Sequence, residues 1–229
     1  MGFLGYTLPT PIQSQAIPAV LNTKDLVGLA QTGTGKTAAF ALPLIQQLLM
    51  NPIAIKGRSA RAIILSPTRE LALQIHEAFV SFGKRLPLNF THAIGGAPIR
   101  KQMRDLSKGV DILVATPGRL EDLVDQKGLR LDETKFLVLD EADQMLDIGF
   151  LPAVKRIISK VNKDRQTLLF SATMSKEIKK LTETYLTDPV QVSVTPENST
   201  VDKIEQSLMH LSKQNKGLAL QRIISANPK

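Results

Sequence analysis

A glycine-rich loop carrying a lysine and a threonine, AQTGTGKT at residues 30–37, has the composition of a phosphate-binding loop. Gly33 and Gly35 permit backbone angles that turn successive N–H groups toward an anion, and the start of a following helix adds positive potential. Lys36 can reach the terminal phosphates of a nucleotide, and the Thr37 hydroxyl is placed to bind Mg²⁺. The residues expected to contact nucleotide here are Thr32, Gly33, Thr34, Gly35, Lys36 and Thr37.

Two acidic residues follow an apolar run in FLVLDEAD, residues 136–143. The run predicts a buried strand whose carboxyl end presents Asp140 and Glu141. Asp140 would hold magnesium, partly through water, and Glu141 would orient or polarise the attacking water, with Lys36 as a third catalytic group. The alternative is that the two acids cap a helix, a common arrangement. Their pairing with the phosphate loop favours the catalytic interpretation.

Short apolar runs predict the elements that must position these groups. They occupy residues 25–30, 61–66, 90–95, 111–116, 136–141, 167–172 and 190–194. Segments of helical period lie between most of them, such as 69–86. Buried strands alternating with amphipathic helices predict an α/β fold, a mostly parallel sheet with helices on both faces. Ligands of such sheets bind beyond the carboxyl ends of the strands, where each candidate motif begins.

The bulk composition narrows the function classes. The chain has no cysteine, which excludes disulfides and thiolate metal sites, and its charge of +8 favours a polyanionic partner, although a merely basic protein is the alternative. The first residues lack the basic and apolar regions of a leader, and no run of about 18 apolar residues occurs. We therefore expect a cytoplasmic chain with no membrane span, and a monomer.

Several motifs occur together in a fixed order: AQTGTGKT (30–37), PTRELALQ (67–74), TPGR (116–119), DEAD (140–143) and SAT (171–173). GYTLPTPIQ (5–13), a Q motif, and the glycine pair at 95–96 also fit. In this order and spacing the chain resembles the amino-terminal RecA-like domain of DEAD-box RNA helicases, a P-loop NTPase fold. That family also has alanine first in its phosphate loop, as at Ala30. The stretches DEADQMLDIGF and VTPENSTVDKIEQS resemble its bacterial RhlE-type branch.

The resemblance implies an ATP-binding domain over residues 1–195, with ATP and Mg²⁺ as cofactors. Gln13 would read the adenine edge through its amide, and Tyr6 would stack on the ring. The alternative for PTPIQ is a proline-stiffened helix start, and both roles can coexist. Ser171 and Thr173 would hydrogen-bond Asp143 and couple the nucleotide site to domain closure, although a simple helix cap is the alternative.

The resemblance also implies a groove for the RNA backbone, with little sequence specificity. Its expected residues are Pro67, Thr68, Arg69, Gly95, Gly96, Thr116, Pro117, Gly118 and Arg119. Each of these short motifs can also be read as a strand-end turn with a helix cap. A neighbouring cluster, Arg100, Lys101 and Arg104, is more typical of a solvated helix face.

Beyond residue 195 the pattern changes. Residues 196–202 are polar and predict a linker, and 203–229 predict one strand (204–211) and one helix (213–225). This tail is either a terminal extension or the truncated start of a second RecA-like domain, which in the family supplies an arginine-rich motif of the form His-Arg-x-Gly-Arg-x-Gly-Arg. We therefore expect an RNA-dependent ATPase or helicase whose present chain has little activity of its own.

Two other functions are compatible with parts of this pattern. The first is a nucleotide-gated RNA-binding scaffold module without useful turnover. The second, an unrelated P-loop enzyme such as a small-molecule kinase, is disfavoured because PTREL, TPGR and SAT occur together.

Overall fold

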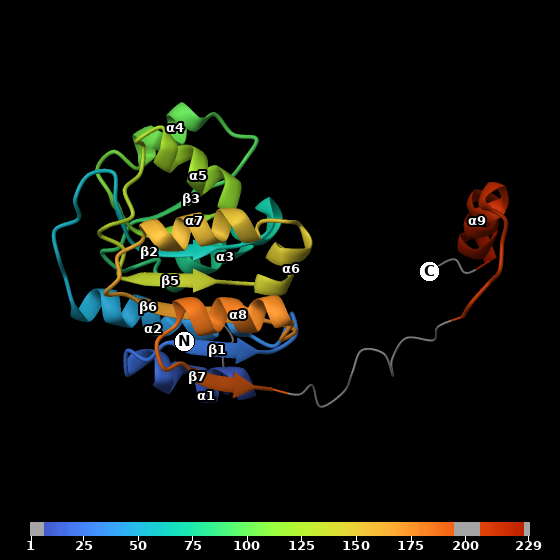
Figure 1. The fold of residues 1–229 in the computed structure, drawn as a ribbon, viewed down its shortest axis with the longest axis horizontal. Coiled ribbons are helices and arrows are strands. Elements are labelled where there is room, and N and C mark those ends of the chain that lie inside the picture. The colour runs from blue at the N-terminus through green and yellow to red at the C-terminus, as the bar shows by residue number, and fades with distance from the viewer. Residues whose placement is uncertain (1–6, 195–206, 227–229) are drawn as a thin grey trace. The chain divides into compact units, whose positions relative to one another are not determined.

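The computed structural model describes residues 7–194 and 207–226, and it separates the chain into two units, 1–195 and 196–229. Figure 1 shows the elements of both. The predicted contact of Tyr6 and the predicted linker at 196–202 lie outside the described residues. That 203–229 begin a second RecA-like domain stays a prediction.

The described strands of the first unit form one seven-stranded sheet in which all neighbours are parallel, in the order β3–β4–β2–β5–β6–β1–β7 (Figure 1). The strands are β1 (Leu26–Leu29), β2 (Ala60–Leu65), β3 (Phe90–Ala93), β4 (Val110–Ala115), β5 (Phe136–Leu139), β6 (Gln166–Ser171) and β7 (Val190–Ser193). Each predicted apolar run overlaps one strand, with boundaries that differ by one or two residues, and the predicted α/β fold is confirmed.

Helices cover both faces of this sheet, because successive strand residues point to opposite sides. One hydrophobic cluster joins the sheet to α1 (Pro11–Leu21), α2 (Lys36–Met50) and α3 (Arg69–Phe82). The other cluster joins it to α4 (Ile99–Asp105), α5 (Pro117–Asp125), α6 (Ala142–Asp147), α7 (Leu151–Lys160) and α8 (Lys176–Tyr185). Ile63 belongs to the second cluster and Ile64 to the first, so β2 is buried on both sides.

Aromatic packing brings the phosphate loop's helix close to the sheet. The Phe40 ring of α2 lies 5.4 Å from the Phe170 ring of β6 and 6.1 Å from the Phe79 ring of α3, centroid to centroid. A Cβ atom at Gly28 would come within 2.6 Å of the Phe170 ring. Glycine at this position of β1 therefore lets Phe170 fill the core beside α2.

The second unit contains a short 3₁₀ helix, η3 (Lys213–Asn215), and α9 (Lys216–Ala226), so the predicted helix is confirmed. The predicted strand is wrong where it can be seen, since residues 207–211 have no regular secondary structure. A strand needs a neighbour for its backbone N–H and C=O groups, and the described part of this unit supplies none. Across 7–194 and 207–226, the helices are too short or too polar to cross a lipid bilayer.

Candidate functional site

The phosphate loop connects β1 to α2 at the carboxyl edge of the sheet. Ala30 follows the strand, is buried and keeps a negative φ, so glycine is not needed there. Gly33 and Gly35 have φ values of 86° and 93°, a region that favours glycine. Gly35 caps the amino end of α2, whose first residue is Lys36. This is the strand–loop–helix arrangement that an anion-binding helix terminus requires.

Lys36 is buried and ion-paired within this edge. Its Nζ donates hydrogen bonds of 2.9 Å to the backbone O of Ala30 and to Oε1 of Glu141. The Thr32 hydroxyl donates to the same Glu141 oxygen, also at 2.9 Å. The lysine of the phosphate loop and the glutamate after β5 therefore meet directly. They meet across β6, because β6 lies between β1 and β5 in the sheet.

Asp140 presents a buried carboxylate with an unsatisfied oxygen. The residue is 2% exposed, and within the described residues its Oδ1 has no hydrogen-bond partner. Burial raises the pKa of Asp140 to about 7, against a lowering by the Lys36 ammonium and a further rise from Glu141. A divalent cation would satisfy this oxygen and remove the cost of burying it. The site therefore fits Mg²⁺, with Asp140 and the half-buried Thr37 hydroxyl as the protein groups on offer.

Gln13 packs against the phosphate loop rather than standing free. It is buried, its Oε1 accepts from the backbone N–H of Thr10 at 3.0 Å, and its Nε2 donates to the backbone O of Gly35 at 3.2 Å. The predicted helix start at this position is present, since α1 begins at Pro11. Gln13 thus links α1 to the loop, and its contact with adenine stays a prediction.

Asp143 bridges α6 to the segment after β6. Its Oδ2 accepts from the backbone N–H groups of Ala172 and Thr173, at 3.1 and 2.9 Å, and from the Thr173 hydroxyl at 3.0 Å. The expected bond from Ser171 is wrong, since its buried hydroxyl has no hydrogen-bond partner in the part of the chain that the structure describes. Ser171 is the last residue of β6 and points into the core, whereas Thr173 lies beyond the strand end.

The predicted RNA-contacting residues gather over β3, β4 and β2, which are neighbours in the sheet. A groove of about 460 Å³ is lined by Pro67, Thr68, Arg69, Gly95, Thr116, Gly118 and Arg119, together with Glu70, Ile148 and Phe150. Of the expected set, Gly96 and Pro117 are not among its lining residues. Pro117 is buried at the first turn of α5. The cap interpretation also holds at Thr68, whose hydroxyl accepts from the backbone N–H of Leu71.

The two arginines of the groove differ in their exposure and in their hydrogen bonds. Arg119 is 12% exposed, and its Nη1 donates to the backbone O of Ala97 and to Oε1 of Gln102. It therefore braces the turn before α4. Arg69 is exposed, and its guanidinium lies where Cβ atoms at Gly95 or Gly96 would approach within 3.0 or 2.6 Å. The glycine pair thus makes room for the more available of the two cations.

A second cavity, of about 470 Å³, lies between the groove and the phosphate loop. Thr68 and Glu70 line both cavities, and Thr32, Glu141 and Asp143 line this one alone. The motifs in the sequence did not predict Ile148 and Phe150 as lining residues of the groove. A sequence feature that could have predicted them is the apolar stretch IGF (148–150), which directly follows DEADQMLD (140–147). The phosphate loop and the RNA groove therefore lie along the same carboxyl edge of the sheet, joined by this second cavity.

Comparison with known proteins agrees with this geometry. The family model for the DEAD/DEAH box helicase matches residues 10–181. "RNA helicase CrhR" of Synechocystis sp. is 47% identical over 222 residues, which cover 96% of this chain and 44% of that protein. "ATP-dependent RNA helicase CshA" of Limosilactobacillus reuteri is 44% identical over 96% of this chain and 43% of its own length. The chain thus spans less than half the length of these relatives.

Solved structures show the same fold. The crystal structure of a DEAD box protein from Methanococcus jannaschii superposes with a TM-score of 0.75 and 37% identity, over 97% of this chain and 59% of that chain. A hypothetical ATP-dependent RNA helicase from Sulfolobus tokodaii gives a TM-score of 0.75 and 32% identity over 84% of this chain and 55% of its own. With a phosphate loop, an acidic pair and a groove along one RecA-like sheet edge, the chain belongs to the DEAD/DEAH box helicase family.

Proposed function

We propose that this chain is the ATP- and RNA-binding amino-terminal domain of an ATP-dependent RNA helicase that locally unwinds or remodels RNA. The observation that carries the proposal is the contact of Lys36 with Glu141 at one end of an edge whose other end is the motif-lined groove. The names of the relatives support it. Because the chain spans 44% of the first of these, the activity of the whole protein is part of the proposal.

ATP would occupy the loop with its phosphates against the N–H groups of residues 32–37. Lys36 would exchange its bond with Glu141 for the terminal phosphates, which frees the Glu141 carboxylate to orient water. Asp140 and Thr37 would hold Mg²⁺, which neutralises charge on the phosphates. Gln13 would select adenine through the part of its amide that Thr10 and Gly35 leave available.

RNA would lie along the groove at the ends of β3, β4 and β2. Arg69 supplies a free cation, and Thr68 and Thr116 supply hydroxyl and backbone groups for phosphate and sugar. Ile148 and Phe150 add apolar contact at the same surface. Since these groups recognise no base edge, the expected sequence specificity is low.

Hydrolysis by this chain alone is expected to be slow. In related phosphoryl-transfer enzymes an arginine finger raises the rate by about 10³–10⁵, and we expect a second domain to supply such arginines here. The test is phosphate release with and without single-stranded RNA, measured for residues 1–229 and for a version extended through a second RecA-like domain. RNA should stimulate the extended protein.

Lack of stimulation in the extended protein, with Glu141 intact, would leave the scaffold function as the better account. ATP and GTP affinities provide a second measurement, in which equal values would remove the role of Gln13. Membership of the RhlE-type branch, the monomeric state and a cytoplasmic location stay predictions.

A further inference from the structure

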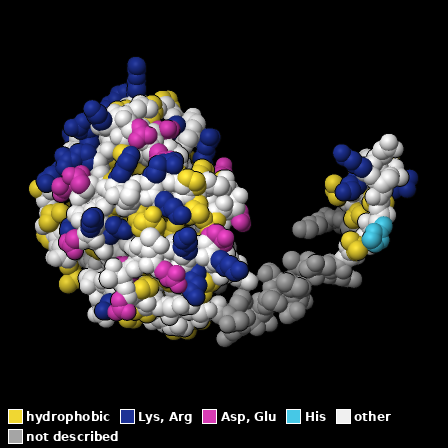
Figure 2. Space-filling model, in the orientation of Figure 1, with side chains coloured by type: hydrophobic (Ala, Val, Ile, Leu, Met, Phe, Trp, Pro, Cys, Tyr) yellow, Lys and Arg dark blue, Asp and Glu magenta, His cyan; other side chains and the backbone are white. Residues whose placement is uncertain are grey.

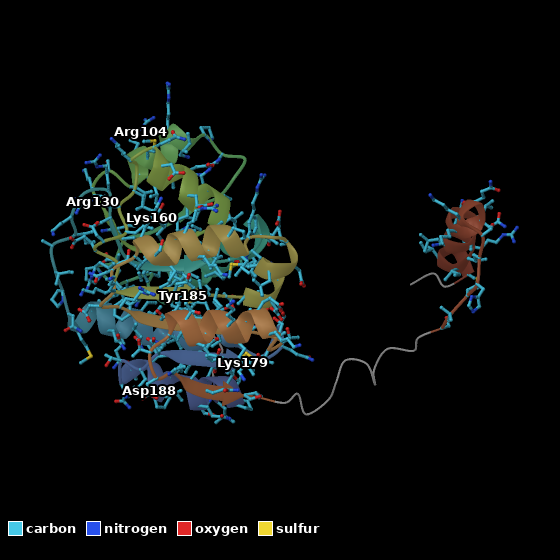
Figure 3. All side chains as sticks on the ribbon, in the orientation of Figure 1. Arg104, Arg130, Lys160, Lys179, Tyr185 and Asp188 are labelled. Atoms are coloured by element: carbon cyan, nitrogen blue, oxygen red, sulfur yellow. The ribbon has the colours of Figure 1, made fainter. Side chains whose placement is uncertain are left out.

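A groove of about 420 Å³ lies between α7 and α8, outside the edge described above. Its lining residues are Leu151, Lys155, Lys176, Glu177, Lys180, Leu181, Thr184 and Tyr185. Figure 1 shows the two helices side by side on one face of the sheet, and Figure 3 places Tyr185 between them. The groove therefore has an apolar floor, a basic rim and an aromatic ring at one end.

Its three lysines differ from neighbouring cations in their lack of partners among the described residues. Within the described residues, the Nζ atoms of Lys155, Lys176 and Lys180 make neither an ion pair nor a hydrogen bond. Cations elsewhere on the same two helices do have partners, as Arg156 does in Glu121 and Lys160 in Asp125. Dark-blue side chains are prominent over these helices in Figure 2.

The placement of these charges opposes helix stability. Lys176 and Lys180 lie one turn apart on α8, and like charges at that spacing destabilise a helix by about 0.2–0.5 kcal/mol. Lys176 is also the first residue of α8, where the positive end of the helix dipole disfavours a cation. Glu177 offsets part of this charge, which leaves three lysines against one glutamate. A bound polyanion would relieve both unfavourable effects.

The α7–α8 groove and the proposed RNA groove are lined by consecutive residues of the chain. Phe150 lines the RNA groove, and the next residue, Leu151, lines the groove between α7 and α8. A strand that leaves the RNA groove beside Phe150 would therefore reach Leu151 first, and then Lys155 one turn along α7. Tyr185 packs partly against the hydrophobic core at the far end of α8 and also lines the groove, so the exposed part of its side chain is available for contact with a base.

We propose that the α7–α8 groove is a second contact for the RNA backbone, which holds the part of a single strand that extends beyond the main groove. This inference rests on the proposed RNA binding of the domain. The lysines bind phosphates as point charges, so the contact adds affinity for length and none for sequence. An acidic protein segment is the competing occupant, and the adjacency of Phe150 in the RNA groove to Leu151 in this groove favours RNA.

The first experiment compares a 6-mer and a 20-mer of oligouridine by fluorescence anisotropy, over a range of salt concentrations. The variant Lys155→Gln/Lys176→Gln/Lys180→Gln should bind the 20-mer roughly tenfold more weakly at low salt, with a salt slope lower by about 2, and bind the 6-mer as the parent does. The control Lys24→Gln/Lys84→Gln/Lys108→Gln removes the same charge from exposed lysines outside the groove and should change little. Thermal unfolding of each variant checks that it is folded.

The second experiment reads the groove directly. The sequence has two tyrosines and no tryptophan, so in a Tyr6→Phe background the fluorescence of tyrosine reports on Tyr185 alone. The 20-mer should change this fluorescence, and the 6-mer should not. An acidic peptide that changes it while the 20-mer does not would overturn the proposal in favour of a protein partner.

The outcomes separate the two proposals. If the parent protein binds neither oligonucleotide, the proposed RNA function fails and this inference fails with it. If both oligonucleotides bind and the groove variant behaves like its control, this inference alone is overturned.

Discussion

At the scale of single residues, Glu141 combines an uncommon backbone conformation with the central contacts of the site. Its φ and ψ of 50° and 53° lie in the left-handed region, which costs a non-glycine residue on the order of 1–2 kcal/mol. The carboxylate nonetheless accepts from both Lys36 and Thr32. Strain that surrounding contacts maintain is typical of functional positions. Here the left-handed backbone conformation directs the Glu141 carboxylate toward the phosphate loop.

Replacing Glu141 with glutamine should separate binding from hydrolysis. The amide keeps an acceptor for Lys36 but cannot polarise water, so phosphate release in a single turnover should fall by about 10²–10⁴. ATP affinity should be retained or increased, since the neutral amide competes less for the ammonium. Glu77→Gln, an exposed change on α3, is the control. Release at more than a third of the parent rate would contradict the role of Glu141.

His76 predicts a pH dependence of stability. Its ring packs edge-on to His92 with centroids 4.7 Å apart, and burial, then the charge of His92, lowers the pKa of His76. The folded state thus binds a proton less readily than the unfolded state. The contribution of His76 to the free energy of unfolding should be largest above pH 6.5 and should decline as the pH falls below that value, whereas the raised pKa of Asp140 contributes in the opposite direction.

The measurement is urea unfolding from pH 7.5 to 5.5 for the parent, His76→Gln and His210→Gln. The decline below pH 6.5 should be smaller in His76→Gln, whereas the exposed His210 should have no effect. Identical profiles for the parent and His76→Gln would show that the histidine pair does not contribute.

At the scale of elements, the candidate site consists of strand ends and helix starts. Lys36, Arg69 and Ala142 each begin a helix directly after a strand and a short turn. Backbone N–H groups are free at such starts, so phosphates of ATP and RNA can be bound by the same local structure. The side chains then decide which anion binds where.

The two glycines of the phosphate loop should differ in their sensitivity. Both have positive φ, so alanine is strained at either position, by roughly 1–2 kcal/mol. At Gly35 the added Cβ would also lie 2.5 Å from Nε2 of Gln13, while at Gly33 it would have no atom of the described residues within 4 Å. Gly35→Ala should therefore lower the free energy of unfolding and ATP affinity more than Gly33→Ala. Urea unfolding and nucleotide titration measure this, and equal effects would contradict it.

At the scale of the whole first unit, the sheet separates function from stability. The groove and the phosphate loop occupy the carboxyl edge, while the opposite edge is held by Asp25. Its two carboxylate oxygens accept from the backbone N–H groups of Thr167 and Thr187, each at 2.7 Å, and its backbone O accepts from Val190. One buried residue therefore joins β1, β6 and the start of β7.

Asp25→Asn should destabilise the fold without altering the site. The amide offers one acceptor where two are needed, and the unfolding free energy should fall by about 2–3 kcal/mol. Asp164→Asn changes an exposed carboxylate paired with Lys135, and it should leave the unfolding free energy unchanged. Urea unfolding and ATP titration of the folded variants provide the comparison. An equal loss of unfolding free energy in both variants would show that the hydrogen bonds of Asp25 do not stabilise the fold in the way proposed.

Local sequence determined the strands, the glycine loop and the residues at each strand end, because these follow from apolar runs and backbone preferences over a few positions. The tertiary structure alone decided which ends meet. In the folded chain Glu141 pairs with Lys36 across β6. Thr173, and not Ser171, donates a hydrogen bond to Asp143, and Arg119 donates one to the backbone O of Ala97. The tertiary structure also left 207–211 without a strand. The physical reason is that hydrogen bonds and ion pairs between distant segments depend on strand order and side-chain direction, which no short stretch encodes.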